Sequence, residues 1–190
     1  MLNKMPGYPE EKFQNLKTGH TFMFGHPGKK LLFMGQDFGQ LREWSEEREL
    51  DWYLLEEESH QHLQDYVRDL LHLYTKYPAL YANDKGYEGF QWINANDGDR
   101  SIFSFVRWSP TGRNNLLFIC NFTPMARHDY ICGVPKNKQY RLILDSSDAK
   151  YGGPSKDRQT VYRSKKGECD GQPYRIAYDL PPFGAAVFTF

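Results

Sequence analysis

The sequence predicts an α+β fold that is mainly β: a helix, one strand and a second helix, followed by an antiparallel β-sandwich. Residues 59–77 repeat apolar side chains at the spacing of a helix that is buried on one side. After about residue 82 the apolar repeat shortens to two residues, as in half-buried antiparallel strands. Clusters of Asn, Asp, Ser, Gly and Pro between these strands are typical of turns. We therefore expect one unit over residues 1–81 and an all-β domain over residues 82–190.

A first helix should begin near Pro9 and end at Gly25. Proline is tolerated in the first turn of a helix, and the two glutamates after it favour the positive end of the helix dipole. An unbroken apolar run follows within residues 30–34 and predicts a strand covered on both faces, as in a parallel sheet wrapped by helices. A lone parallel strand cannot form a sheet, so this run indicates the end of a larger enzyme.

The second helix should begin at Ser59, a residue type that suits the N-cap, and should end before Pro78 because the residue before a proline disfavours helical backbone. In the second part of the chain, alternation and turn chemistry place the strands at 90–93, 102–108, 116–122, 139–144, 161–163, 174–180 and 185–190. The dipeptide Lys165-Lys166 is expected in a solvated turn between two of these strands.

Composition and charge exclude several classes of function. The 24 basic residues balance the 24 acidic residues, so no electrostatic reason exists to expect a nucleic acid or an anionic membrane as partner. No apolar run approaches the length of a membrane span and the first residues lack a signal pattern, so a cytoplasmic protein is expected. The three cysteines include no CxxC pair, which argues against a disulfide framework and against zinc.

Neither a metal nor a cofactor is expected. No glycine run fits a phosphate-binding loop or a dinucleotide fingerprint, and no serine lies in a GxSxG elbow. The histidines lack the spacing of metal ligands and are expected at the surface; they are His20, His26, His60, His62, His72 and His128.

The long segment between the expected helices, residues 35–58, is the candidate site. Its amides, carboxylates and tryptophans could bind sugar hydroxyls and the apolar face of a sugar ring. Equally, the segment could pack on itself, with Phe38, Trp44 and Trp52 as plugs. Its carboxylates could form an acid/base pair of the kind that glycoside chemistry requires, or could be solvated or bonded to nearby backbone. The 16% aromatic content likewise suits either a β-rich core or stacking on sugars.

Several segments are specific enough to compare with known families: KMPG, KFQNLK, HPGKKLLFMGQDFGQ, EW, LDW, LQDYVRDLLHLYTKYPAL, GFQWINAND, SFVRW, LLFICNFTP and LPPFGAAVF. Together these segments resemble bacterial 1,4-α-glucan (glycogen) branching enzymes of the α-amylase superfamily over nearly the whole chain. The resemblance implies a β/α barrel followed by a C-terminal all-β domain. Residues 1–81 would be the end of the barrel, with its last strand at 31–34, and residues 82–190 would be the C-terminal domain.

The resemblance also implies a reaction and its participants. In the family, an aspartate nucleophile, a glutamate acid/base and a second aspartate transfer α-1,4-glucan segments to a 6-hydroxyl, which forms α-1,6 branches. None of these carboxylates has a match here, so the chain is expected to hold no catalytic residue and to be inactive alone. Family members usually carry glutamate at position 37, where this chain has Asp37, and a role for that residue is doubtful. The residues that match positions near the substrate cleft are Gln36, Glu43, Trp44, Asp51 and Trp52.

The expected partner is α-glucan, bound through the parent enzyme. An isolated chain would also have to cover the apolar run at 31–34, by folding its first helix back or by self-association. Alternative interpretations are a carbohydrate-binding β-domain that stacks sugars on Trp92, Trp108 or surface tyrosines, or the C-terminal part of another α-amylase-superfamily enzyme. An interaction domain without glucan contact is a further alternative, and full burial of Trp44 and Trp52 would favour it.

Overall fold

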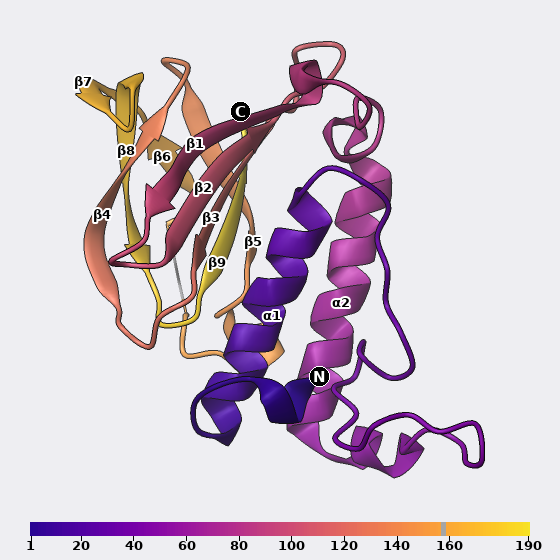
Figure 1. Ribbon diagram of the computed structural model, residues 1–190. Coiled ribbons are helices and arrows are strands. Elements are labelled where there is room, and N and C mark those ends of the chain that lie inside the picture. Colours follow the sequence, from indigo (N-terminus) through magenta and orange to yellow (C-terminus); the bar gives the residue numbers. More distant parts are fainter. Residues whose placement is uncertain (157–158) are drawn as a thin grey trace.

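The computed structural model describes residues 1–156 and 159–190, and it shows two long helices packed against one face of a β-sandwich (Figure 1). The helices are α1 (Pro9–Gly25) and α2 (Glu58–Lys76), which lie side by side. In the first turn of α1, the backbone N–H of Tyr8 donates to the Glu11 carboxylate at 2.8 Å, as expected of a capped N-terminus. Short 3-10 helices span Leu2–Lys4, Trp52–Glu56, Pro78–Leu80, Tyr87–Gly89 and Ala149–Tyr151.

The strands of the described residues form two antiparallel sheets. The larger sheet has the order β1-β2-β3-β9-β5-β6, and the smaller sheet has the order β4-β8-β7. The bounds of the strands are β1 (Phe90–Asp97), β2 (Ile102–Arg107), β3 (Leu116–Asn121), β4 (Arg127–Val134), β5 (Gln139–Asp145), β6 (Val161–Arg163), β7 (Lys165–Cys169), β8 (Gln172–Leu180) and β9 (Ala185–Thr189). The α+β, mainly β fold that the sequence predicts is therefore confirmed.

The larger sheet is the middle layer, with apolar contacts on both of its faces. One cluster fills the space between the sheets and includes Ile119, Ile176 and Phe188. A second cluster joins the other face of the larger sheet to the helices and includes Phe118 and Tyr66. Strand β3 is buried along its whole length because both faces are covered, which explains why its sequence is apolar without alternation.

A buried ion pair connects the helices to the sandwich. The Arg107 side chain is fully buried at the end of β2 and forms an ion pair with Asp84. Its guanidinium also donates to the carbonyl oxygen of Gly25, at the end of α1, at 2.9 Å and to that of Gly89 at 3.1 Å. A buried cation needs this many partners to offset the loss of water. Arg107 therefore ties the end of α1, the segment before β1 and the sheet together.

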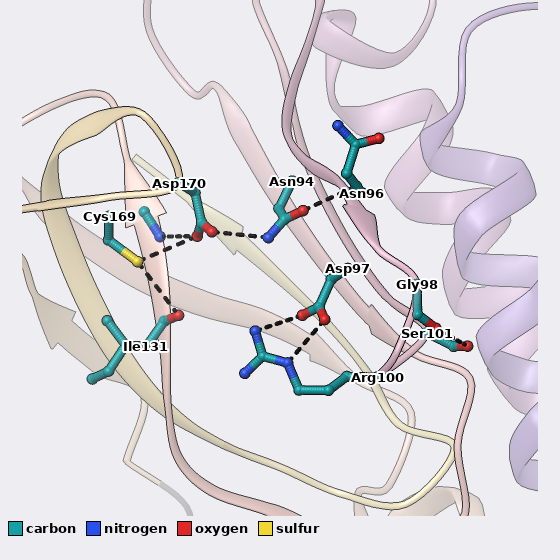
Figure 2. Close-up of polar contacts among 10 residues, drawn as sticks. Asn94, Asn96, Asp97, Gly98, Arg100, Ser101, Ile131, Cys169 and Asp170 are labelled. Atoms are coloured by element: carbon teal, nitrogen blue, oxygen red, sulfur yellow. Dashed lines mark hydrogen bonds and ion pairs between the residues drawn. The ribbon is translucent and has the colours of Figure 1, made fainter.

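A polar network joins the two sheets at the segment that reads INAND in the sequence (Figure 2). The Asn94 side chain on β1 donates to the Asp170 carboxylate at 2.9 Å, and the backbone N–H of Gly133 on β4 donates to the same carboxylate at 2.8 Å. Close by, Arg100 pairs with Asp97, and its guanidinium lies 5.4 Å from the centre of a tyrosine ring on β4. These contacts give the motif a role in holding the sandwich closed.

Both expected helices and every expected strand of the second part are present, but two strands were not predicted. Strand β4 has a bulge between Arg127 and Tyr130 and a positive φ at Asp129, which break the alternation that marks a strand. Strand β7 includes Lys165 and Lys166, so the predicted turn at this dipeptide is wrong. This strand lies at the edge of the smaller sheet, where charged side chains are common.

The strand predicted at residues 30–34 is absent from this structure. The backbone there is irregular, the Leu31 side chain is 71% exposed, and Phe33 and Met34 are also exposed. Only Leu32 packs under the helices. The reason is physical: within the described residues, all strands begin at Phe90 or later, and none lies beside this run to accept its hydrogen bonds.

Candidate functional site

The candidate site, residues 35–58, lies in the segment between α1 and α2 and begins with a tight turn. Gly35 and Gly39 adopt positive φ angles of 79° and 76°, a conformation that glycine adopts without strain. A Cβ at Gly35 would lie 2.8 Å from the Gln40 side chain, and one at Gly39 would lie 2.9 Å from Leu63. The N–H of Gln40 closes the turn by donating to the carbonyl of Gly35 at 2.9 Å.

Two buried histidines, one from each helix, hold this turn in place. His20 on α1 bonds through Nε2 to the carbonyl oxygen of Gln36 at 3.2 Å, and His60 on α2 bonds through Nδ1 to that of Phe38 at 2.7 Å. Burial lowers the pKa of His20 to about 4, against the opposing effects of the Gln36 hydrogen bond and the Asp37 charge. His20 is therefore neutral at pH 7. The prediction that His20 and His60 lie at the surface is wrong, because both side chains bond to this turn.

The rest of the segment is closed by an arginine–carboxylate clasp. Arg42 donates from Nε to Asp51 Oδ2 at 2.9 Å, and its Nη2 pairs with Oδ1 of the same carboxylate. Gln40 binds both ends of the clasp: its Oε1 accepts from the N–H of Asp51 at 3.0 Å, and its Nε2 donates to the carbonyl of Arg42 at 3.3 Å. The hydrogen bond from Arg42 lowers the pKa of the Asp51 carboxyl. Asp51 is thus ionised, buried and already paired.

The two tryptophans of the segment are half exposed. Trp52 is 51% exposed, and its ring centre lies 5.2 Å from that of the fully buried Phe38, with the two planes 33° apart. Trp44 is 46% exposed and meets Phe33 edge to face at 5.3 Å. Only Phe38 acts as a plug. The condition that would have favoured an interaction domain without glucan contact, full burial of Trp44 and Trp52, is not met.

The other predicted site residues have local partners. Glu43 is exposed and forms an ion pair with Lys4 at 2.7 Å, which lowers the pKa of the glutamate. Gln36 is half buried, and its Oε1 accepts weakly from the N–H of Phe33 at 3.4 Å. Because Glu43 and Asp51 each face a cation, the structure favours hydrogen-bonded carboxylates over an acid/base pair.

Sequence reasoning missed the residues that support the site. Gln40, Arg42 and the two buried histidines do not belong to the predicted set, although they organise it. A signal was available for His60, which lies three residues before Leu63 and therefore on the buried stripe of α2. No comparable pattern marked Gln40 or Arg42.

Among residues 1–156 and 159–190, no group of three or more His, Cys, Asp or Glu side chains could hold a metal ion. None of the helices within these same residues is both long and apolar enough to span a membrane. Trp92 is partly exposed but packs against neighbouring aromatic rings on the larger sheet. Trp108 is half buried, with the Lys136 amine 4.9 Å from its ring centre.

The fold defines a class: an antiparallel β-sandwich whose larger sheet carries two helices and an ordered, aromatic connecting segment. The family model described as "Alpha amylase, C-terminal all-beta domain" matches residues 92–190, and the chain belongs to this family. Solved structures agree with the fold. An α-amylase from H. orenii superposes with a TM-score of 0.59 at 14% identity, covering 94% of this chain and 35% of the other. Isomaltulose synthase PalI from Klebsiella sp. LX3 gives 0.58, also at 14% identity, over 93% of this chain and 38% of the other.

Similar curated proteins are considerably longer than this chain. The 1,4-alpha-glucan branching enzyme GlgB of Butyrivibrio fibrisolvens is 53% identical over all 190 residues, which correspond to 30% of that enzyme. The enzyme of the same name from Halothermothrix orenii is 40% identical over 188 residues, covering 99% of this chain and 30% of the enzyme. The chain therefore spans 30% of the length of each of these relatives.

Proposed function

We propose that this chain is the C-terminal portion of a 1,4-α-glucan branching enzyme, a glycosyltransferase of glycogen biosynthesis in the cytoplasm. Such an enzyme transfers α-1,4-glucan segments to a 6-hydroxyl and forms α-1,6 branches. The observation that carries the proposal is the 53% identity with a branching enzyme over the full 190 residues. Residues 1–81 would complete a β/α barrel, and residues 82–190 would be the C-terminal all-β domain. The partner is α-glucan, with no nucleic acid or membrane.

Within this enzyme, the segment between α1 and α2 would line part of the glucan cleft. Half-exposed indole rings suit the apolar face of a pyranose, and neighbouring amides and carboxylates suit its hydroxyls. Both chemistries occur together in this segment. The catalytic carboxylates would come from elsewhere in the enzyme, so the chain alone would be inactive. The residues proposed to line the cleft are Gln36, Glu43, Trp44, Asp51 and Trp52.

The proposal also gives a role to the exposed apolar run at residues 30–34. In the whole enzyme this run would pair with neighbouring strands and become the last strand of the barrel. Its backbone, which pairs with no strand among the described residues, and its exposed side chains, Leu31 above all, support this role. In the isolated chain the same surface favours self-association.

The test is an activity measurement on the full-length protein that carries this chain. With amylose as substrate, we expect new α-1,6 linkages, detected by proton NMR and by debranching followed by chain-length analysis. The chain of residues 1–190 serves as the matched control and should form none. Hydrolysis of amylose without new α-1,6 linkages would contradict the proposal and favour another enzyme of the α-amylase superfamily.

A further inference from the structure

The Trp52 ring is half exposed to solvent and is supported by the buried Phe38 ring, and the exposed face of Trp52 is here called the Trp52 platform. Phe38 is fully buried, whereas Trp52 is 51% exposed, so one aromatic ring supports another that remains accessible. An aromatic side chain that is exposed at the end of a loop gains little from stacking on a ligand if the ligand must first order it. What holds the platform therefore matters for what it can bind.

Along the chain, the platform is fixed by the residue before it. Asp51 precedes Trp52 and makes three polar contacts. Arg42 binds its carboxylate through two nitrogens, and the Gln40 side chain accepts a hydrogen bond from its backbone N–H at 3.0 Å. The Asp51 side chain is only 3% exposed, whereas that of Arg42 is 53% exposed. Because a paired arginine–carboxylate fork is directional, the clasp fixes the orientation of the backbone from which Trp52 projects.

From below, the platform is fixed by α2. His60 on that helix bonds to the carbonyl oxygen of Phe38 at 2.7 Å, and the His60 ring is itself buried, with Phe13 of α1 edge-on at 5.0 Å. The Phe38 ring thus rests on a backbone that is anchored to the helix pair. One support acts on the backbone at residue 51 and the other on the backbone at residue 38, and Gln40 links them because it lies in the same turn as Phe38.

We propose that Arg42, Gln40 and His60 are positioning residues, which hold the Trp52 platform ready to stack on a glucose unit of the bound α-glucan. This assignment rests on the proposed function and adds residues that would touch no substrate. It also changes the role proposed for Asp51: this residue would hold the loop and would not contact the sugar. Pre-organised contacts of this kind improve binding by removing the ordering cost from the binding step.

The first experiment uses the full-length protein with Arg42→Met. Removing the guanidinium leaves the Asp51 carboxylate buried without its partner, so Asp51 should turn towards water and take Trp52 with it. We expect KM for amylose to rise about tenfold while kcat stays within about twofold, as for a lost binding contact. Arg68→Met is the matched control, because Arg68 pairs with Asp65 on the exposed face of α2, and it should leave both constants unchanged. Arg42→Lys keeps the charge with a single contact and should give an intermediate KM.

A double-mutant cycle tests whether Arg42 acts through Trp52. Trp52→Ala should raise KM by itself, and adding Arg42→Met to it should produce no further increase, because the platform is already absent. If the increase in KM of the double variant equalled the product of the increases in the two single variants, the proposal would be overturned, because Arg42 would then contribute by a separate route. An unchanged KM in Arg42→Met would overturn it as well.

Hydrogen exchange of the same full-length variants provides a readout that does not depend on activity. Arg42→Met should speed the exchange of amides at residues 50–53 by at least tenfold and leave residues 63–73 of α2 protected. Unchanged exchange at residues 50–53 would overturn the positioning role even if KM rose. If the wild-type protein formed no branches, the proposed function would fail, while the exchange result would still decide whether Arg42 holds the platform.

Discussion

At the scale of single residues, Arg107 is expected to contribute strongly to stability. Its fully buried guanidinium serves Asp84 and two backbone carbonyls at once. In Arg107→Met these acceptors lose a buried donor, and breaking a buried ion pair in this way costs about 3–5 kcal/mol. We expect the free energy of unfolding, measured in urea, to fall by that amount. The control is Arg113→Met, at an exposed position in the turn before β3. If the free energy of unfolding of Arg107→Met fell by less than about 1 kcal/mol, the assigned role would be contradicted.

His20 should make stability depend on pH. Its pKa is lowered from 6.5 to about 4 by burial, so between these values the unfolded chain binds a proton that the folded chain does not. Its contribution is therefore complete above pH 6.5 and is lost as the pH falls towards 4, to a total of about 3 kcal/mol. We expect the stability difference between wild type and His20→Gln to shrink by this amount between pH 7 and pH 4. Parallel pH curves would contradict the prediction, and His128→Gln, at an exposed position, is the control.

The same residues show what a sequence can and cannot reveal about burial. The spacing of Leu63, Tyr66 and Leu70 predicts one buried face of α2, and all three are buried. His20 and His60 were placed at the surface because imidazole is polar and no ligand pattern was present. Their burial depends on carbonyl groups of the 35–40 turn, which lie 16 and 22 residues away in the chain. Local periodicity carries no information about such partners.

At the scale of elements, prediction succeeded where local pattern and tertiary environment agree. The helices and the alternating strands such as β8 bury one face, and their sequences display it. The sequences of the bulged strand β4 and the charged edge strand β7 do not display a buried face in this way. For the candidate site, the polar and aromatic composition singled out the right segment, but the Arg42–Asp51 clasp could not be foreseen, because the two residues lie nine positions apart along an irregular loop.

The apolar run at 30–34 gives a prediction about an element that depends on its neighbours. Within the described residues, the N–H groups of Leu31 and Leu32 donate no backbone hydrogen bond, so they should exchange within seconds to minutes in this chain. In the full-length protein, pairing in the proposed barrel should protect them at least a hundredfold. Exchange measured by mass spectrometry on both proteins checks this, with Leu70 in α2 as a protected reference in each. Equal, fast exchange in both would show that the run is not a barrel strand.

At the scale of the whole molecule, the expected division at residue 82 runs through a shared core. Phe24 of α1 and Tyr66 of α2 belong to the same buried cluster as Phe105 and Phe118 of the larger sheet. The Phe105 and Phe118 rings stack with centres 4.9 Å apart, and a Cβ at Gly25 would approach them to within 2.8 Å, so α1 ends in direct contact with the sheet. Helices and sandwich therefore stabilise each other.

This shared core leads to an expectation about residues 82–190 produced alone. Without the helices, the outer face of the larger sheet would expose Phe105, Leu116, Phe118 and Val187, and a contiguous apolar patch of this kind favours association. We expect the shortened chain to bind more of a hydrophobic dye and to self-associate more strongly in light scattering than residues 1–190. Residues 1–190 should unfold in one transition that circular dichroism and tryptophan fluorescence report at the same urea concentration. A monomeric residue 82–190 domain as stable as the whole chain would contradict this. It would mean that the contacts between sheet and helices, Arg107 included, contribute little to folding.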